Sequence, residues 1–250
     1  MSTVGKTMNK VLSYCVYGDL PKYTIGAIKN AESKKDFFPD WEMRVYHDNS
    51  VPTDILSKLD QLNINLIDVT KETSGVYYPT KEESKTYGMF WRFVPAGDSD
   101  VDYFVSRDTD SRFSEREVLA VNEWIESNKP FHIIREHPWG HTWVINGGMW
   151  GCEGGFIEGI DQSIKEYLKV SQWSHQQAAD QWFLKECIYP VVKDYAFVHD
   201  EYVNHEGRSV AIKRDRALDN FAFIGEPFDE NENYDQSHRD LIQKYYNQNK

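Results

Sequence analysis

The chain has 250 residues, three cysteines and a formal net charge of −12. Its length is enough to bury a substantial core, and we expect one large domain rather than two small ones. The negative charge argues against binding to nucleic acid or to anionic membrane surfaces, because both need a basic face. Three widely spaced cysteines indicate neither a disulfide framework nor a zinc knuckle.

The sequence shows no targeting or membrane signal. Its first residues, MSTVGKTMNK, lack the apolar core of a signal peptide, and no run of about 18 apolar residues occurs in the chain. We therefore expect a cytoplasmic protein that does not insert into a membrane.

Strand-like and helix-like segments alternate through the first 70 residues. The run VLSYCVYG predicts a strand and PKYTIGAIKNAES a helix, followed by the strand EMRVYHD, the helix DILSKLDQL and the strand INLIDV. This alternation is typical of a parallel sheet covered by helices, in which ligands bind beyond the carboxyl ends of the strands. The first strand is not followed by G-x-G-x-x-G or a P-loop, so the usual dinucleotide motif is missing.

The middle of the chain leads to a pair of acids. Residues 70–85 are polar and predict a mobile loop near a ligand site, and YGMFWRFVP predicts a short helix that ends before its proline. The apolar run DYFV then ends at RDTDSR. Asp108 and Asp110 therefore lie in a loop between a strand and a helix that begins with a capping box of Ser114 and Glu117.

The second half mixes short strands and helices. FHIIREHP predicts a strand before the glycine-rich stretch VINGGMWGCEGG. DQSIKEYLKV and AADQWFLKECI predict helices, and YAFVHD, SVAIKR and FAFIGE predict short strands. From Glu226 onward the chain is polar, so it either wraps the surface or is disordered.

Two carboxylates one residue apart at the end of a strand can hold Mg²⁺ or Mn²⁺ and leave coordination positions for phosphate oxygens. A bound metal would let this acidic protein bind a diphosphate. The alternative is a structural role, in which Asp108 and Asp110 cap the next helix and pair with Arg107 and Arg112.

The order of several motifs resembles that of the GT-A-fold, nucleotide-sugar-dependent glycosyltransferases. VLSYCVYG and VYHD resemble their first two strands, GMFWRF the helix before the metal strand, and SRDTD their D-x-D metal motif. INGGMWG is similar to the turn that lines the sugar pocket, and ADQWFL to a helix start in glycogenin-like members. RDTDSR, REHP and GGMWG together most closely resemble glycosyltransferase-like proteins of large DNA viruses and bacteria. The resemblance covers roughly residues 10–200.

This resemblance implies an α/β fold of the GT-A (Rossmann-like) type. We expect a mostly parallel central sheet flanked by helices, with a small antiparallel subregion on the acceptor side. Residues 1–250 would form one domain, with a nucleotide-binding half at about 10–110, a sugar and acceptor half at about 111–225, and a polar C-terminal tail.

The resemblance also implies roles for individual residues. Mn²⁺ or Mg²⁺ would be bound by Asp108, Asp110 and His199, with Asp200 competing for the role of His199. The nucleotide and the donor sugar would contact Tyr17, Gly18, Asp48, Arg92, Asp108, Asn146, Gly147 and Gly148. The alternatives are packing for Tyr17, a surface ion pair for Arg92, a tight turn for the glycines and an ordinary surface or supporting group for His199.

Sugar transfer also needs a group that takes the proton of the acceptor hydroxyl. Asp180 in ADQWFL is the main candidate, with helix capping or a salt bridge as its alternative. A base across the sugar from the metal indicates inversion of the anomeric configuration, and one beside the leaving group favours retention. Weaker candidates for the base are Glu136, His137 and His141. A basic loop over the diphosphate is not obvious, and the residues that could replace it are Arg208, Lys213 and Arg214.

These features predict a metal-dependent glycosyltransferase that uses a UDP-sugar rather than a GDP-sugar and a hydroxyl acceptor, such as a glycan. One alternative is a weakly active or inactive domain of the same fold that binds a glycan or a nucleotide. Another is a sugar nucleotidyltransferase, although the glycine-rich basic loop of that class is missing after the first strand. A haloacid dehalogenase-type phosphatase does not fit, because its aspartate pair follows the first strand.

Overall fold

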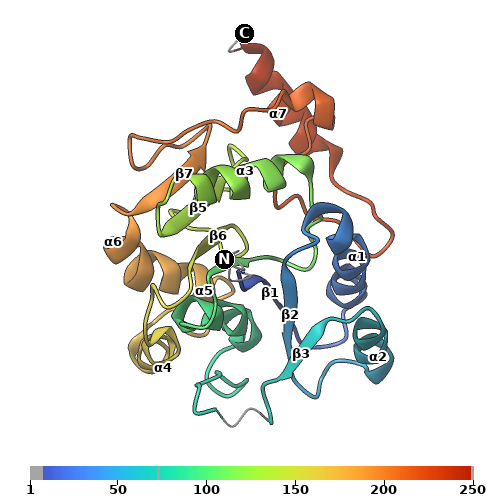
Figure 1. The fold of residues 1–250 in the computed structure, drawn as a ribbon, viewed down its shortest axis with the longest axis vertical. Coiled ribbons are helices and arrows are strands. Elements are labelled where there is room, and N and C mark those ends of the chain that lie inside the picture. The colour runs from blue at the N-terminus through green and yellow to red at the C-terminus, as the bar shows by residue number, and fades with distance from the viewer. Residues whose placement is uncertain (1–7, 72–73, 249–250) are drawn as a thin grey trace, which may run out of the picture.

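The computed structural model describes residues 8–71 and 74–248. Figure 1 shows a central sheet with helices on both sides. Within the described residues the sheet has seven strands in the order β3-β2-β1-β4-β6-β5-β7. The strands are β1 (Lys10–Val16), β2 (Glu42–His47), β3 (Asn65–Asp68), β4 (Tyr103–Ser106), β5 (Phe131–Arg135), β6 (Trp150–Glu153) and β7 (Ala196–Asp200).

All the described strands except β6 run in the same direction. β6 pairs antiparallel with both β4 and β5, whereas the other strand pairs are parallel. The expected α/β fold with a mostly parallel sheet is therefore confirmed. Its antiparallel part is a single strand inside the sheet.

The helices connect consecutive strands or follow them. The α-helices are α1 (Pro21–Phe37), α2 (Thr53–Gln61), α3 (Glu115–Glu126), α4 (Ile160–Val170), α5 (Ala179–Phe183), α6 (Tyr189–Val192) and α7 (Gln236–Gln248). Two 3₁₀-helices, η1 (Tyr87–Gly97) and η3 (Arg216–Asp219), and a π-helix, η2 (Leu184–Ile188), complete the set.

The two faces of the sheet carry separate hydrophobic cores. Val11 of β1 pairs with Phe104 of β4, and both belong to the core that also contains residues of η1, α4 and α5. The next pair, Leu12 and Val105, belongs to the core shared with α1, α2 and α3. Successive side chains of a strand point to opposite faces of the sheet, so the same pairing of β1 with β4 contributes side chains to both cores.

Strand β6 was not expected, because its stretch is rich in glycine. Trp150 and Cys152 are buried in the η1 side of the core, and Gly151 lies between them. A Cβ atom on Gly151 would be 2.4 Å from the carbonyl oxygen of Phe104. Gly151 therefore lies inside a strand, where the absence of a side chain lets the neighbouring backbone come close. Glycine-rich stretches more often indicate turns, which is why this strand was not expected.

Three other expectations for single elements were wrong. SVAIKR and FAFIGE are not strands; the first contributes one isolated bridge, between Val210 and His199, and the second consists of turns. The 3₁₀-helix η1 continues through Pro95 to Gly97 instead of ending before the proline. Of the two alternatives for the polar tail, disorder does not hold for residues 236–248, which form α7 and bury Ile242.

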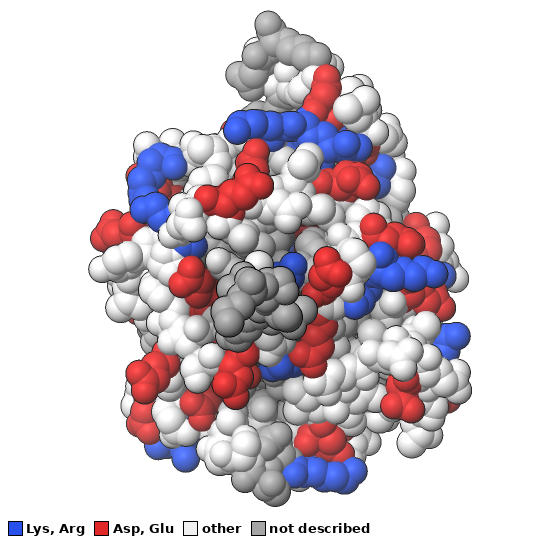
Figure 2. All heavy atoms as spheres, viewed as in Figure 1, with Lys and Arg blue, Asp and Glu red and all other residues white. Residues whose placement is uncertain are grey.

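Charged side chains of both signs are spread over the face of the molecule seen in Figure 2. On the side seen in Figure 2, acidic and basic side chains are intermixed and no broad basic area is visible. None of the helices in the described part of the chain combines the length and the apolar character that crossing a membrane requires.

Candidate active site

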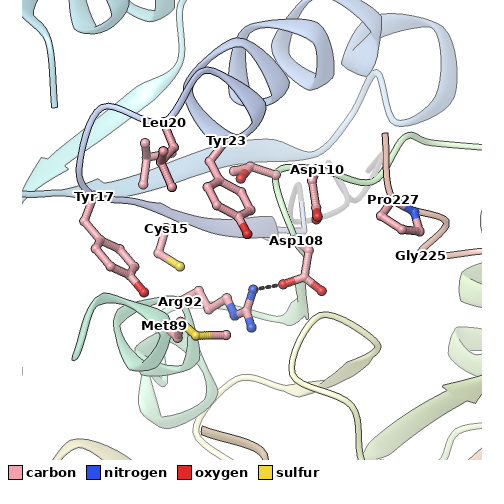
Figure 3. Close-up of a pocket in the computed structure, with 12 residues that line it drawn as sticks. Cys15, Tyr17, Leu20, Tyr23, Met89, Arg92, Asp108, Asp110, Gly225 and Pro227 are labelled. Carbon is pink, nitrogen blue, oxygen red and sulfur yellow. Dashed lines mark hydrogen bonds and ion pairs between the residues drawn. The ribbon is translucent and has the colours of Figure 1, made fainter. Parts of the chain in front are cut away.

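A cavity of about 400 Å³ lies beyond the carboxyl ends of β1 and β4 (Figure 3). Its wall combines the β1–α1 connection, η1, the β4–α3 loop and a C-terminal segment. These segments contribute Tyr17, Arg92, Asp108, Asp110 and Gly225. In Figure 3 the carboxylates of Asp108 and Asp110 lie one above the other, with Arg92 on one side and the C-terminal segment on the other. The cavity is thus where an α/β sheet is expected to bind a ligand.

The acidic pair is held by two cations from other elements. Nη1 of Arg92, on η1, forms an ion pair with Oδ1 of Asp108. Nζ of Lys22, in the first turn of α1, lies 2.8 Å from Oδ2 of Asp110. Asp108 and Asp110, two of the three predicted metal ligands, line one cavity.

The structural alternative for the two acids is not what the structure shows. The N-cap of α3 is Ser114, whose Oγ accepts a hydrogen bond from the backbone N–H of Glu117 at 3.2 Å. Only this half of the expected capping box forms, because the Glu117 carboxylate turns to Arg107, 2.8 Å from its Nε. Arg112 pairs with Glu232 at 2.8 Å. Arg107 and Arg112 thus form ion pairs with glutamates and not with Asp108 and Asp110.

Arg92 also connects the acidic pair to the predicted base. Its Nη2 lies 3.2 Å from Oδ2 of Asp180, at the start of α5. The Arg92 and Asp180 side chains are 3% and 0% exposed, whereas the Asp108 side chain is 40% exposed. One buried guanidinium therefore holds Asp108 in the cavity wall and Asp180 behind it.

The pKa values of the three acids differ because of these neighbours. Burial would raise the pKa of Asp108, but the Arg92 guanidinium prevails and holds it below the usual value. Burial and the negative charge of Asp108 raise the pKa of Asp110, against the opposing effect of Lys22. Burial also raises the pKa of Asp180 to about 6. Closely placed carboxylates with divergent pKa values are typical of functional sites.

The predicted glycine turn packs against this cluster. A Cβ atom on Gly147 would be 2.5 Å from Oδ2 of Asp180, and one on Gly148 would be 2.1 Å from Oδ2 of Asp108. The carbonyl oxygen of Gly147 accepts a hydrogen bond from Oγ of Ser106 at 2.7 Å. Only glycine allows the backbone to approach the carboxylates so closely.

Two polar atoms next to this turn have no hydrogen-bond partner among the described residues. They are Oδ1 of Asp180 and Nδ2 of Asn146, and both are buried. Buried polar atoms are rarely left unpaired, and a bound ligand is one explanation. An acceptor and a donor at this place suit the hydroxyl groups of a sugar.

The predicted nucleotide contacts lie along the ends of β1 and β2. Tyr17 lines the cavity and packs against Tyr87, with 4.9 Å between the ring centroids. Asp48 accepts a hydrogen bond from the Tyr87 hydroxyl at 2.8 Å. Gly18 has a positive φ of 72° and donates its N–H to Oγ of Ser50, which in turn donates to Asp48. Asp48 and Gly18 do not line the cavity, but both connect to it through this network.

The structure does not bring His199 to the acidic pair. Its strand β7 is separated from β4 by β6 and β5, which corresponds to roughly 14 Å across the sheet. Both ring nitrogens are occupied, Nδ1 by His132 at 2.9 Å and Nε2 by Glu123 at 3.0 Å. Asp200 is paired with Arg135 at 2.6 Å. The described residues contain no group of three or more His, Cys, Asp or Glu that could hold a metal.

The weaker base candidates have structural partners. Glu136 is buried between Arg116 and Arg216, which hold its pKa below the usual value despite burial. Nδ1 of His137 accepts the backbone N–H of Gly140 at 2.8 Å, and Nδ1 of His141 accepts that of Glu136 at 3.0 Å. None of the three lines the cavity.

The basic residues that could replace a closing loop are also engaged. Arg208 donates to the carbonyl oxygen of Lys193, Nζ of Lys213 lies 3.6 Å from Glu123, and Nε of Arg214 lies 2.9 Å from Asp219. They are absent from the cavity lining in the part of the chain that the structure describes.

Sequence reasoning missed the C-terminal wall of the cavity. Gly225 and Pro227 line it, and the next residue, Phe228, donates its N–H to the carbonyl oxygen of Asp110 at 2.7 Å. Farther along, Glu232 pairs with Arg112. The only signal for this segment is the turn-forming Gly-Glu-Pro of FAFIGEPF.

The acidic pair fits a divalent cation. Two carboxylates line the cavity side by side, and the raised pKa of Asp110 reflects burial and repulsion that a cation would relieve. Mg²⁺ is usually bound through one or two carboxylates, with phosphate oxygens and water as its other ligands. Asp108 and Asp110 match that partial set, and the remaining ligands would come from a bound diphosphate.

No protein-family model matches the chain, and no curated protein matches its sequence. Several solved structures are similar to it. A glycosyltransferase involved in glycosylation of the major capsid of the virus PBCV-1 aligns at a TM-score of 0.46 and 16% identity, over 77% of this chain and 81% of its own. The galactosyltransferase LgtC, in complex with donor and acceptor sugar analogues, aligns at 0.48 and 15% identity, over 76% and 73%. A cytidylyltransferase from Leptospira borgpetersenii aligns at 0.42 and 10% identity, over 97% and 95%.

Glycosyltransferases are thus among the structures that the chain resembles, as the order of its motifs predicts. At this level of similarity, function has to be argued from the side chains of the cavity.

Proposed function

We propose that the chain is a metal-dependent glycosyltransferase that moves a sugar from a nucleoside-diphosphate sugar, a UDP-sugar, to a hydroxyl of an acceptor glycan. The observation that carries this proposal is the convergence of two cavity-lining carboxylates with the buried Arg92–Asp180 pair and the Asn146–Gly148 turn. Each feature suits one part of such a donor.

The donor would lie in the cavity with its nucleoside near Tyr17 and its sugar towards Asn146 and Asp180, which are buried behind the cavity wall. Tyr17 offers an aromatic ring to the nucleoside, beside the network of Asp48 and Tyr87. The diphosphate would bind at Asp108 and Asp110 together with Mn²⁺ or Mg²⁺, which would stabilise the charge that grows on the leaving phosphate. The unpaired atoms of Asn146 and Asp180 would then take the sugar hydroxyls.

Arg92 has a positioning role in this arrangement. Its planar guanidinium makes separate contacts to Asp108 and Asp180, so it fixes the distance between the metal-binding and sugar-binding parts of the site. Arg92 also lines the cavity, so its direct contact with the diphosphate stays a prediction beside this positioning role.

Asp180 would act at the reacting sugar from the side of the leaving group. It shares one guanidinium with Asp108, so it lies on the side of the metal and not across the sugar from it. A base beside the leaving group favours retention of the anomeric configuration, so retention is the expected outcome. With a pKa of about 6, the carboxyl is mostly ionised at neutral pH and can accept a hydrogen bond or a proton.

The proposal is tested by incubating the protein with a panel of UDP-sugars and measuring UDP release with Mn²⁺ and with a chelator. We expect release from one or a few donors, faster with an acceptor glycan and abolished by the chelator. Binding of UDP without its release from any UDP-sugar would indicate a nucleotide-binding domain without transferase activity. Absence of both binding and release would contradict the donor assignment.

A further inference from the structure

A second cavity of about 590 Å³ forms an open groove between α4 and the end of η2. It is lined from α4 by Glu166 and Tyr167, from the following loop by Gln172 and Trp173, and from η2 by Glu186. Its volume is in the range of ligand-binding clefts. It shares no lining residue with the candidate active site.

Trp173 is held rigidly at the edge of this groove. Its ring stacks on Trp182 with 4.3 Å between the centroids and 7° between the planes, and its Nε1 donates to Oε1 of Glu186 at 3.2 Å. Trp182 covers one face of Trp173 and does not itself line the groove. Trp173 therefore presents its other side to the groove, and little side-chain entropy would be lost when a ligand packs against it.

The polar groups of the groove determine which ligand fits that ring. Glu186 and Gln172 offer acceptor oxygens, as does Glu166, which also forms an ion pair with Lys169 at 2.8 Å. No lysine or arginine is among the residues that line the groove in the described structure. This set repels phosphate and sulfate groups and favours a neutral ligand with many O–H donors and an apolar face, which describes a neutral sugar.

Three tryptophans, Trp143, Trp182 and Trp173, pack in a row that ends at this groove. Trp182 follows Asp180 by two residues on α5, and Trp143 precedes Asn146 by three. Trp143 packs edge-on against Trp182 at 5.0 Å, and Trp182 stacks on Trp173. The row therefore begins with residues that are close in the sequence to those assigned to the donor sugar, and it ends in the groove at Trp173.

We propose that the groove binds a neutral oligosaccharide through Trp173, and that this oligosaccharide is the distant part of the acceptor. The second statement rests on the proposed function, whereas the first does not. Transfer would occur at the Asp180 end of the row, while a sugar farther along the acceptor chain packs against Trp173.

The test measures binding of maltopentaose, cellopentaose and mannopentaose, without donor or metal, by tryptophan fluorescence and by ligand-observed NMR. We expect millimolar binding of at least one of them and a roughly five- to tenfold weaker affinity for Trp173→Ala, the scale of one lost ring contact. Trp173→Phe should recover part of the affinity. Trp139→Ala is the matched control, because Trp139 is 70% exposed and lies outside the row.

Three results would overturn the proposal. One is that no oligosaccharide binds at about 10 mM to protein that binds UDP with Mn²⁺; in that case the proposed function stands and the groove assignment fails. Another is equal affinity in wild type and Trp173→Ala at unchanged melting temperature. The third is a dimer that Trp173→Ala dissociates, which would make the groove an interface between copies of the chain. Oligosaccharide binding through Trp173 without any UDP binding would instead contradict the proposed function alone.

Discussion

Nζ of Lys22 lies 2.8 Å from Oδ2 of Asp110, so the first turn of α1 supplies a cation to the more deeply placed acid of the pair. We propose that this acid binds a metal, and a lysine and a divalent ion then compete for the same carboxylate. The ion pair therefore stabilises the metal-free site and lowers its affinity for metal.

We expect Lys22→Met to increase the affinity for Mn²⁺ in the absence of nucleotide. The Lys22 side chain is 39% exposed, so the gain should be modest, about two- to fivefold. Electron paramagnetic resonance of free Mn²⁺ measures it directly. Lys35→Met, on the same helix, is the control and should change nothing. A weaker affinity for Mn²⁺ in Lys22→Met would show that the lysine supports the metal site instead of competing with it.

Replacing Asp180 by asparagine should lower the rate of transfer at least ~100-fold while the affinity for UDP changes little. The pKa of Asp180 is raised by burial to about 6, so the wild-type rate should fall as the pH drops through that value and the carboxylate becomes protonated. The residual rate of the variant should lack this acid limb. Rate measurements between pH 5 and 8 check both points. Full activity in Asp180→Asn would show that Asp180 is not the base.

The two glycines of the turn should have separable effects. A Cβ atom on Gly148 would be 2.8 Å from the backbone nitrogen of Asp108, which cannot move away easily, whereas one on Gly147 would meet the side chains of Asp180 and Arg92. We expect Gly148→Ala to cost about 1–3 kcal/mol of stability and to weaken Mn²⁺-dependent UDP binding. Gly147→Ala should lower the transfer rate and leave UDP binding largely intact. Identical effects of both variants would contradict the division of the site into a metal part and a sugar part.

The contribution of two histidines to stability should decrease as the pH falls from about 6.5 towards 4. Burial, together with the nearby His238 and Arg216, lowers the pKa of His137 to about 4, and burial and His137 lower that of His141 to about 3. Over this pH range each of these histidines binds a proton more readily in the unfolded chain than in the native one, so its contribution to the free energy of unfolding decreases as the pH falls. The buried carboxyls of Glu117 and Asp180, whose pKa values are raised to about 7 and about 6, act in the opposite direction. Thermal melts over this range measure the slope, which His137→Gln should reduce. A slope that is the same in His137→Gln and in wild type would contradict the shift of His137.

The regular elements and the acidic pair were predictable from the sequence because their signals are local. Hydrophobic runs mark β1, β2 and β4, and in a parallel sheet the residues after such strands meet at one edge. That is why Tyr17 and Asp108 line the same cavity. The glycines of the turn lie at the same edge, since they follow β5 and precede the antiparallel β6, and their contact with a donor sugar stays a prediction.

The parts that depend on strand order or on distant pairing could not be predicted. His199 lies near the end of a strand, and Asp108 follows one, so the sequence makes the two positions look alike. In the sheet, however, β7 lies three positions from β4, and the order of strands cannot be read from a single sequence. Lys22 and the segment around Pro227 reach the cavity through tertiary contacts alone. Gly151 sits in a strand because the Phe104 backbone passes close to it, a contact that composition does not reveal.

The most direct test of the central claim is calorimetric titration of UDP into wild type and Asp110→Ala, each with Mn²⁺ and with a chelator. We predict that wild type binds UDP far more tightly with Mn²⁺, and that Asp110→Ala loses this metal dependence while its melting curve in the absence of ligand shows an intact fold. UDP affinity that is the same with Mn²⁺ and with the chelator, or that retains its full metal dependence in Asp110→Ala, would contradict the assignment of the acidic pair as the metal-binding part of a donor site.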